Sequence, residues 1–145
     1  MRLGHINSAE LLELMPEKKV AVEKTQKLAS DLQVKMESMS AEYEQKIADY
    51  QKGQATMSQT IRQSTESDIM ALQQRIQQFQ VTAQEEIGKE EQRLLQPILD
   101  KARTAIENVA KANGFTYIFD VSTGATVYEG GEDVLPLVKK ELGMQ

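Results

Sequence analysis

Apolar residues recur at steps of three and four through two long stretches of the chain. That spacing places them along one side of an α-helix, as a stripe that a partner has to cover. In the first stretch, residues 17–52, the stripe consists of Leu28, Leu32, Met36, Met39, Tyr43, Ile47 and Tyr50. In the second, from Ile61 to Ala112, it consists of Ile69, Leu72, Ile76, Phe79, Ala83, Ile87, Leu94, Ile98, Ala102, Ala105, Val109 and Ala112. Neither helix can bury its stripe alone, so the sequence predicts an antiparallel coiled-coil hairpin over residues 17–113.

The reversal between the two helices has two candidate positions. Gly53 suits the left-handed conformation that ends many helices, and Thr56 or Ser58 can cap the next helix. A tip near residues 53–58 brings apolar residues together in each layer, as in the pairs Leu32–Phe79, Met36–Ile76 and Met39–Leu72. A reversal at "RQSTESD", residues 62–68, would pair Leu32 with Ile98, and periodicity alone leaves it open. We expect the tip at 53–58, with the helices projecting as an arm because each is longer than a compact domain needs.

The first sixteen residues predict a strand and a short helix. "RLGHIN" is a strand candidate with Leu3 and Ile6 on opposite faces. Ser8 is the expected N-cap of a helix over "SAELLELM", whose apolar face consists of Leu11, Leu12 and Met15. Pro16 either ends that helix or begins the next one.

After Asn113-Gly114, a helix C-cap signal, the chain changes to an extended pattern. "FTYIFDV" is β-branched and aromatic on both faces, which favours an interior strand. "STGA" is the expected turn of a β-hairpin, and "TVYEG" is its returning strand. Glu132 or Asp133 is then expected to cap a last helix that has Pro136 in its first turn.

These elements predict an α+β chain in which the helical hairpin projects from a small β-rich body made of residues 1–16 and 114–145. A sheet of about three strands is too small to be stable alone, and its open edges need partners from other chains. We therefore expect the body to assemble copies of the chain into a trimer. The candidate assembly residues are Leu3, Ile6, Tyr117, Ile118, Phe119, Val121, Val127 and Tyr128.

Composition excludes several classes of function. The net charge of −5 argues against nucleic acid, which is bound through Lys and Arg. The chain has no Cys and a single histidine, His5, without a nucleophile or base beside it, so we expect neither an enzyme nor a cofactor. Glu85, Glu86, Glu90 and Glu91 lie beside Lys89, which favours a solvated helix face over a metal site. No apolar run is long enough to span a membrane, and the first residues lack a signal-peptide core, so either the protein is cytosolic or a signal has been removed.

Three segments of the chain resemble the OmpH/Skp family of periplasmic chaperones. They are "GHINSAELLELMPE", the stretch from "FQVTAQEEIGKEEQ" to "NGFTYIFDVSTG", and "VYEGGEDVLPLVKKEL". The resemblance implies a homotrimer whose strands form a small barrel and whose helical hairpins surround a cavity. It also implies ATP-independent holding of unfolded outer-membrane proteins in the periplasm, after removal of a signal peptide. The candidate client-binding residues on the arm are Tyr50, Met57, Ile61, Arg62, Met70 and Arg75.

The charge of the chain departs from that of the basic family members. Residues 17–113 carry 14 Lys or Arg against 15 Asp or Glu, so the arm is nearly neutral. The segment after "FQ", where the family can place arginines, is Val-Thr-Ala-Gln-Glu at residues 81–85, which speaks against lipopolysaccharide binding. Contact with a membrane surface would then be indirect.

Two further classes share a coiled-coil arm. A prefoldin-like cytosolic chaperone also presents helical hairpins on a β body, and a signal peptide encoded upstream would exclude it. A structural coiled-coil spacer would bind no client.

Overall fold

The computed structural model describes all residues from Met1 to Gln145. The strands are β1 (Leu3–Ile6), β2 (Tyr117–Asp120) and β3 (Glu132–Asp133), and the helices are α1 (Ser8–Leu14), α2 (Pro16–Gly53), α3 (Gln59–Asn113) and α4 (Leu135–Glu141). Single 3₁₀ turns cover Gln54–Thr56 and Val121–Thr123. None of the helices combines the length and the apolar character that a membrane span requires. The predicted fold class, a long helical hairpin with a small sheet, is confirmed.

The chain forms two compact units, which are Met1–Glu23 with Glu91–Gln145 and Lys24–Glu90. The first unit therefore holds the first turns of α2 and the last turns of α3 as well as the sheet. The sequence analysis assigns assembly of the chain's copies to residues 1–16 and 114–145, and client binding to residues 17–113. This division stays a prediction.

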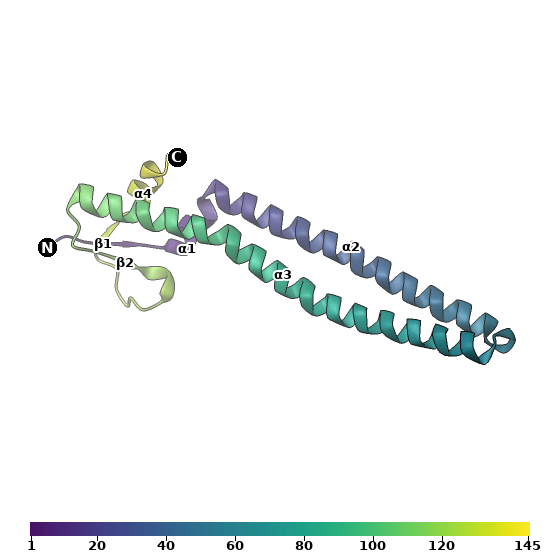
Figure 1. The fold of residues 1–145 in the computed structure, drawn as a ribbon. Coiled ribbons are helices and arrows are strands. Elements are labelled where there is room, and N and C mark those ends of the chain that lie inside the picture. The colour runs from purple at the N-terminus through teal and green to yellow at the C-terminus, as the bar shows by residue number, and fades with distance from the viewer. The chain divides into compact units, whose positions relative to one another are not determined.

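Within Lys24–Glu90, α2 and α3 run side by side in opposite directions and are joined by the turn at Gln54–Thr56 (Figure 1). The alternative reversal at residues 62–68 is wrong, because that segment lies inside α3. The backbone of Gly53 has a right-handed helical conformation (φ −103°) and not the expected left-handed one, so its backbone angles do not require glycine. Ser58 caps α3 as expected, with its hydroxyl accepting a hydrogen bond from the Ile61 N–H (3.2 Å).

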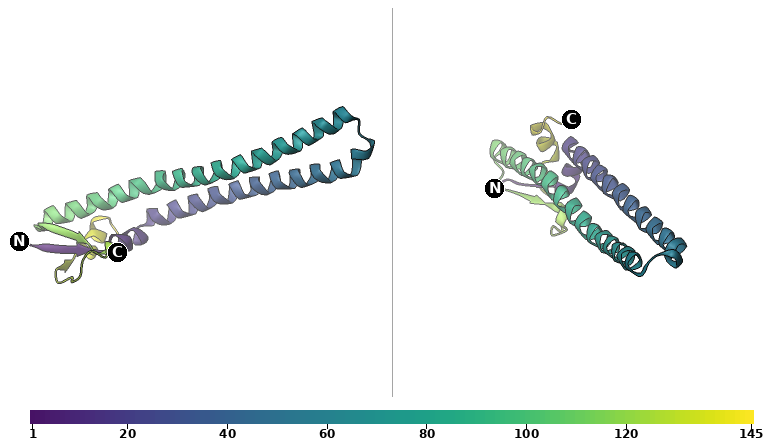
Figure 2. Two further views of the ribbon diagram at one scale, coloured as in Figure 1. Left: turned by 90° about the horizontal axis from the view of Figure 1, so that it is seen from below. Right: turned by 45° about the vertical axis from the view of Figure 1, so that its right-hand side comes forward.

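The three strands form one parallel sheet in the order β2-β1-β3. The left view of Figure 2 shows β1 and β2 next to each other beside the last turns of α3. The expected β-hairpin is wrong, since residues 126–130 form no strand and the chain crosses to the opposite edge of β1 before β3 begins. β2 is consequently an edge strand, not an interior one. Parallel neighbours need such a crossover, whereas a tight turn can join only antiparallel strands.

One face of the sheet covers the core of this unit. Ile6, Leu11, Met15, Val134 and Val138 are fully or almost fully buried there. The last turns of α3 complete the core with small and branched side chains, namely Ile98, Ala102, Ala105 and Val109. Gly4 is needed in β1, because a Cβ there would lie 3.0 Å from side-chain carbons of both Phe115 and Val134.

The ends of the short helices differ in part from expectation. α1 is capped by Asn7, whose side chain accepts from the Glu10 N–H (3.1 Å), and the predicted cap Ser8 instead bonds to Asp120. Before α4, Asp133 accepts from the Leu135 N–H (3.0 Å), and Pro136 lies in the first turn as expected. Glu132 is not a cap, because it pairs with Arg2 (2.6 Å). At the end of α3, Gly114 adopts the predicted left-handed conformation (φ 72°).

Candidate functional site

The second face of the sheet exposes apolar side chains to solvent. In the parallel register Leu3 lies beside Tyr117 and His5 beside Phe119, so these four share the face opposite Gly4 and Ile6. Leu3, Tyr117 and Phe119 are 43%, 58% and 49% exposed. The rings of Tyr117 and Phe119 stack with centroids 6.0 Å apart. An aromatic surface of this kind on a small edge strand is typical of an interface.

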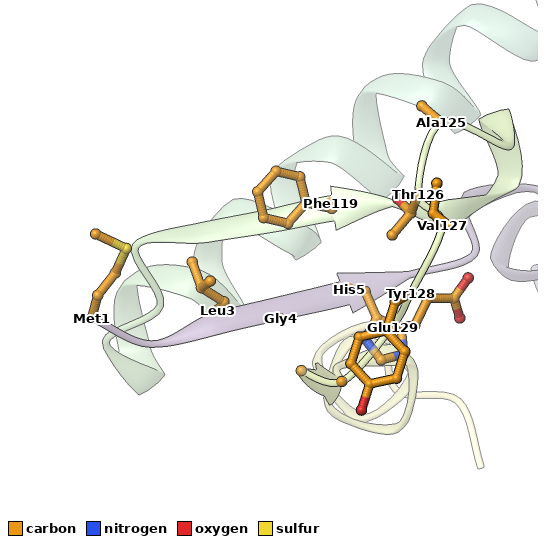
Figure 3. Close-up of a pocket in the computed structure, with 12 residues that line it drawn as sticks. Met1, Leu3, Gly4, His5, Phe119, Ala125, Thr126, Val127, Tyr128 and Glu129 are labelled. Atoms are coloured by element: carbon orange, nitrogen blue, oxygen red, sulfur yellow. The ribbon is translucent and has the colours of Figure 1, made fainter.

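A groove of about 900 Å³ runs between this face and the loop Ala125–Gly131. Figure 3 shows Met1, Leu3 and Phe119 on the sheet side and Val127 and Tyr128 on the loop side. The two loop residues are almost fully exposed, at 101% and 85%. The Tyr128 ring lies against Gly130, where a Cβ would come within 2.5 Å of it. The loop therefore presents its apolar side chains instead of packing them inside the chain.

His5 lines the same groove and contains the one buried side-chain polar atom that lacks a partner, its Nδ1. A buried polar group is normally hydrogen-bonded, because leaving it unpaired costs about 1–3 kcal/mol. This atom is already covered by the chain's own residues. The uncovered apolar area of Leu3, Tyr117 and Phe119 is therefore the feature that points to a contact one chain does not supply.

The structure brings together five of the eight predicted assembly residues. Leu3, Phe119, Val127 and Tyr128 line the groove, and Tyr117 stacks beside it. Ile6 is 2% exposed inside the chain's own core, so it supports the sheet but offers nothing to a partner. Ile118, on the core side of β2, and Val121 are half-buried.

The predicted client-binding residues do not converge on one pocket. Tyr50 donates a hydrogen bond to Glu66, and this bond to a carboxylate raises the pKa of the Tyr50 hydroxyl above its ordinary 10.0. Met57 is half-buried and packs over Gly53. A Cβ added at Gly53 would lie 3.2 Å from the methyl group of Met57. The other four are exposed along α3, namely Ile61, Arg62, Met70 and Arg75. Such a scattered set suits many weak contacts and no single strong one.

Two polar clusters were not predicted from the sequence. Arg2 donates to the Asn113 carbonyl (2.5 Å), pairs with Glu132 and lies 4.3 Å from the centre of the Phe115 ring. Asp120 accepts hydrogen bonds from Ser8 and Ser122. Both join residues more than a hundred positions apart, and no local pattern signals such contacts. No group of three or more His, Asp or Glu side chains is placed to hold a metal ion.

Comparison with known proteins gives one consistent result. The sequence model of a family described as "Outer membrane protein (OmpH-like)" matches residues 2–142. A solved structure, that of a candidate OmpH-like outer membrane chaperone from Caulobacter crescentus CB15, superposes with a TM-score of 0.86 at 14% identity. The match covers 97% of this chain and 82% of that one. The comparison with curated proteins finds no match.

Proposed function

The chain belongs to the OmpH-like family, and from this premise we propose that it is an ATP-independent holdase chaperone for unfolded outer-membrane proteins in the periplasm. The observation that carries the proposal is the family match across residues 2–142, which includes the helical hairpin as well as the sheet. The fold of the Caulobacter protein, itself described as a candidate chaperone, supports it.

The sheet is the assembly surface in this proposal. Three copies would cover one another's Leu3, Tyr117 and Phe119. Burying those side chains stabilises the assembly by about 25 cal/mol for each Å² of apolar area removed from water. A sheet with so few strands gains its stability from that assembly.

The helical hairpins are the client-binding part. Held together by the trimer, three hairpins would make many weak contacts with one unfolded chain, so that avidity replaces a strong single site. The exposed residues available for this include Ile61, Met70 and Val81 on α3 and Val34 on α2. Holding needs no nucleotide, and the client leaves when it folds into its membrane.

The test is whether the protein prevents aggregation of an unfolded outer-membrane β-barrel that is diluted from urea. We expect the wild type, at a threefold molar excess of chains and without ATP, to suppress the increase in light scattering. Bovine serum albumin at equal mass is the control for crowding. If scattering increases as it does with albumin, the chain is a coiled-coil spacer. Suppression limited to soluble β-proteins would favour a prefoldin-like role.

A further inference from the structure

One side of α3 in the Lys24–Glu90 unit carries no charge along six heptad-spaced positions. They follow one another at steps of four, three, four, three and four, which keeps them on one face of a helix. Every one of them is exposed to solvent. We name this set the uncharged stripe, and it consists of Gln63, Ser67, Met70, Gln74, Gln77 and Val81.

The uncharged stripe lies away from the contact with α2. The residues of α3 that are partly or fully buried within this unit, such as Leu72, Ile76 and Ala83, fall on the other side of the helix. Met70 and Val81 are 61% and 55% exposed, although both are apolar. The hairpin itself therefore leaves the uncharged stripe uncovered.

The glutamine amides of the stripe are also open. Elsewhere in α2 and α3, glutamines donate to a side chain four residues further on, as Gln45 does to Asp49 (2.8 Å) and Gln78 to Thr82 (3.2 Å). Gln63, Gln74 and Gln77 are exposed to solvent, and the residues four positions after them are Ser67, Gln78 and Val81. Each amide can both donate and accept, which is what the backbone of an extended chain requires.

A shallow hollow of about 380 Å³ lies on the stripe. Its lining comes from α3 alone and is made of Gln63, Glu66, Ser67, Met70, Ala71 and Gln74. Ser67 and Ala71 are small, so they leave a depression beside the longer Met70 and Gln74. The hollow can take an apolar side chain, and the flexible Met70 can adapt to its shape.

These features disfavour two kinds of partner. A third helix packed in coiled-coil fashion would need apolar residues at most heptad positions, and only Met70 and Val81 meet that need. A highly charged segment would find no opposite charge among the six residues of the stripe, and Glu66 at the edge of the hollow already accepts a hydrogen bond from Tyr50. An uncharged segment, in contrast, can cover those six residues without removing water from a charged side chain of the stripe, which would be costly.

We propose that the uncharged stripe binds an extended, uncharged segment of a transmembrane β-strand before that strand folds. The glutamines would bond to its backbone, while Met70 and Val81 would contact its lipid-facing side chains. Such strands carry few charges on that side. The stripe is about 27 Å long at ~1.5 Å per residue, which is the length of about eight extended residues at ~3.3 Å. This inference rests on the proposed function and names the part of the client that is recognised.

Two double variants of the full-length protein test this. Gln74→Lys with Gln77→Lys places two charges on the stripe, and Gln73→Lys with Gln80→Lys places two on the adjoining exposed side of the same helix. The probe is a fluorescent, end-capped ten-residue peptide in which valine alternates with serine, and its binding is followed by anisotropy. We expect the stripe variant to weaken binding about tenfold and the flanking variant to change it less than about twofold. Met70→Gln, which adds no charge, should weaken binding about threefold.

Equal effects of the two double variants, or a larger effect of the flanking one, would overturn the inference. If the stripe variant instead lowers the solution mass of the protein, the stripe is a contact between copies and the inference is likewise wrong. Circular dichroism of each variant shows whether the helices are retained. If a lysine variant unfolds, peptide binding by Met70→Gln decides the test instead. If the wild type suppresses aggregation of an unfolded barrel protein while all variants bind the peptide as the wild type does, this inference is refuted and the proposed function is left standing. A wild type without suppression would refute the proposed function.

Discussion

Asp120 joins the end of β2 to the start of α1. Its carboxylate accepts from the Ser8 N–H (3.2 Å), the Ser8 hydroxyl (2.5 Å) and the Ser122 N–H (3.0 Å). Burial alone would raise the pKa of Asp120, but the hydrogen bonds from Ser8 and Ser122 outweigh it and hold the pKa below the ordinary 3.8. A lowered pKa in the folded state means that the contribution of Asp120 to stability is present above pH 3.8 and is lost as the pH falls through the folded-state value.

Asp120→Asn should therefore destabilise the protein at neutral pH and matter less in acid. Urea unfolding at fixed protein concentration, followed by circular dichroism, gives the midpoint at about pH 7 and at about pH 3. We expect the difference between wild type and variant to shrink at the lower pH. A difference that stays constant across this range would show that the Asp120 charge does not contribute.

Gly4→Ala tests the close packing of β1 against the core. The added methyl group would lie 3.0 Å from carbons of Phe115 and Val134, so we expect a loss of about 1–3 kcal/mol in the free energy of unfolding. Gly88→Ala is the matched control, because no heavy atom lies within 4 Å of a Cβ there and alanine favours a helix. Equal midpoints for Gly4→Ala and wild type in urea would contradict the packing of β1.

Among the elements, α2 and α3 could be predicted from the sequence because helical periodicity is local.

The seam between α2 and α3 leads to a cross-linking prediction. Met39→Cys combined with Leu72→Cys should oxidise to a disulfide within the chain, since both side chains lie on the partly or fully buried sides of adjacent helices. The control pair, Met39→Cys with Glu91→Cys, should not, because position 91 is about 28 Å further along α3. Mobility on a non-reducing gel distinguishes the two outcomes, and the reverse result would show a different helix register.

The sheet could be predicted only in part, because its pairing is not local. β1 and β2 carry strand residues, and both were expected. β3 consists of Glu132 and Asp133, which have no strand preference and pair with β1 because the crossover places them there. The strand preference of "TVYEG" was overridden, and its apolar residues line the groove with their side chains exposed. The same long-range pairing explains why Arg2 and Asp120 were missed.

At the scale of the whole molecule, assembly through the sheet face is the first consequence to test. Phe119→Asp should dissociate the proposed trimer, because it would bury an unpaired charge in the interface. Val34→Asp, an apolar-to-acidic change at a similarly exposed site on α2, should leave the solution mass unchanged. Analytical ultracentrifugation measures both. A wild type that is monomeric at micromolar concentration would refute assembly through this face.

The near neutrality of residues 17–113 predicts that client binding depends weakly on salt. Raising the ionic strength from ~0.05 to ~0.5 M shortens the Debye length from about 14 to about 4 Å, yet affinity for an unfolded barrel protein should change only a few-fold. Met57→Ser with Ile61→Ser should weaken binding more than Arg62→Gln with Arg75→Gln. A collapse of affinity in salt, or a larger effect of the arginine changes, would mean that positive patches near the turn govern binding.

The most direct measurement is the mass of the complex that the chain forms with an unfolded outer-membrane β-barrel protein. The client is diluted from urea into the protein without ATP, and size-exclusion chromatography with multi-angle light scattering gives the mass. A trimeric holdase predicts one soluble species with the mass of three 16.3 kDa chains and one client. Elution of the chain without client, while the client aggregates, would contradict the proposed function.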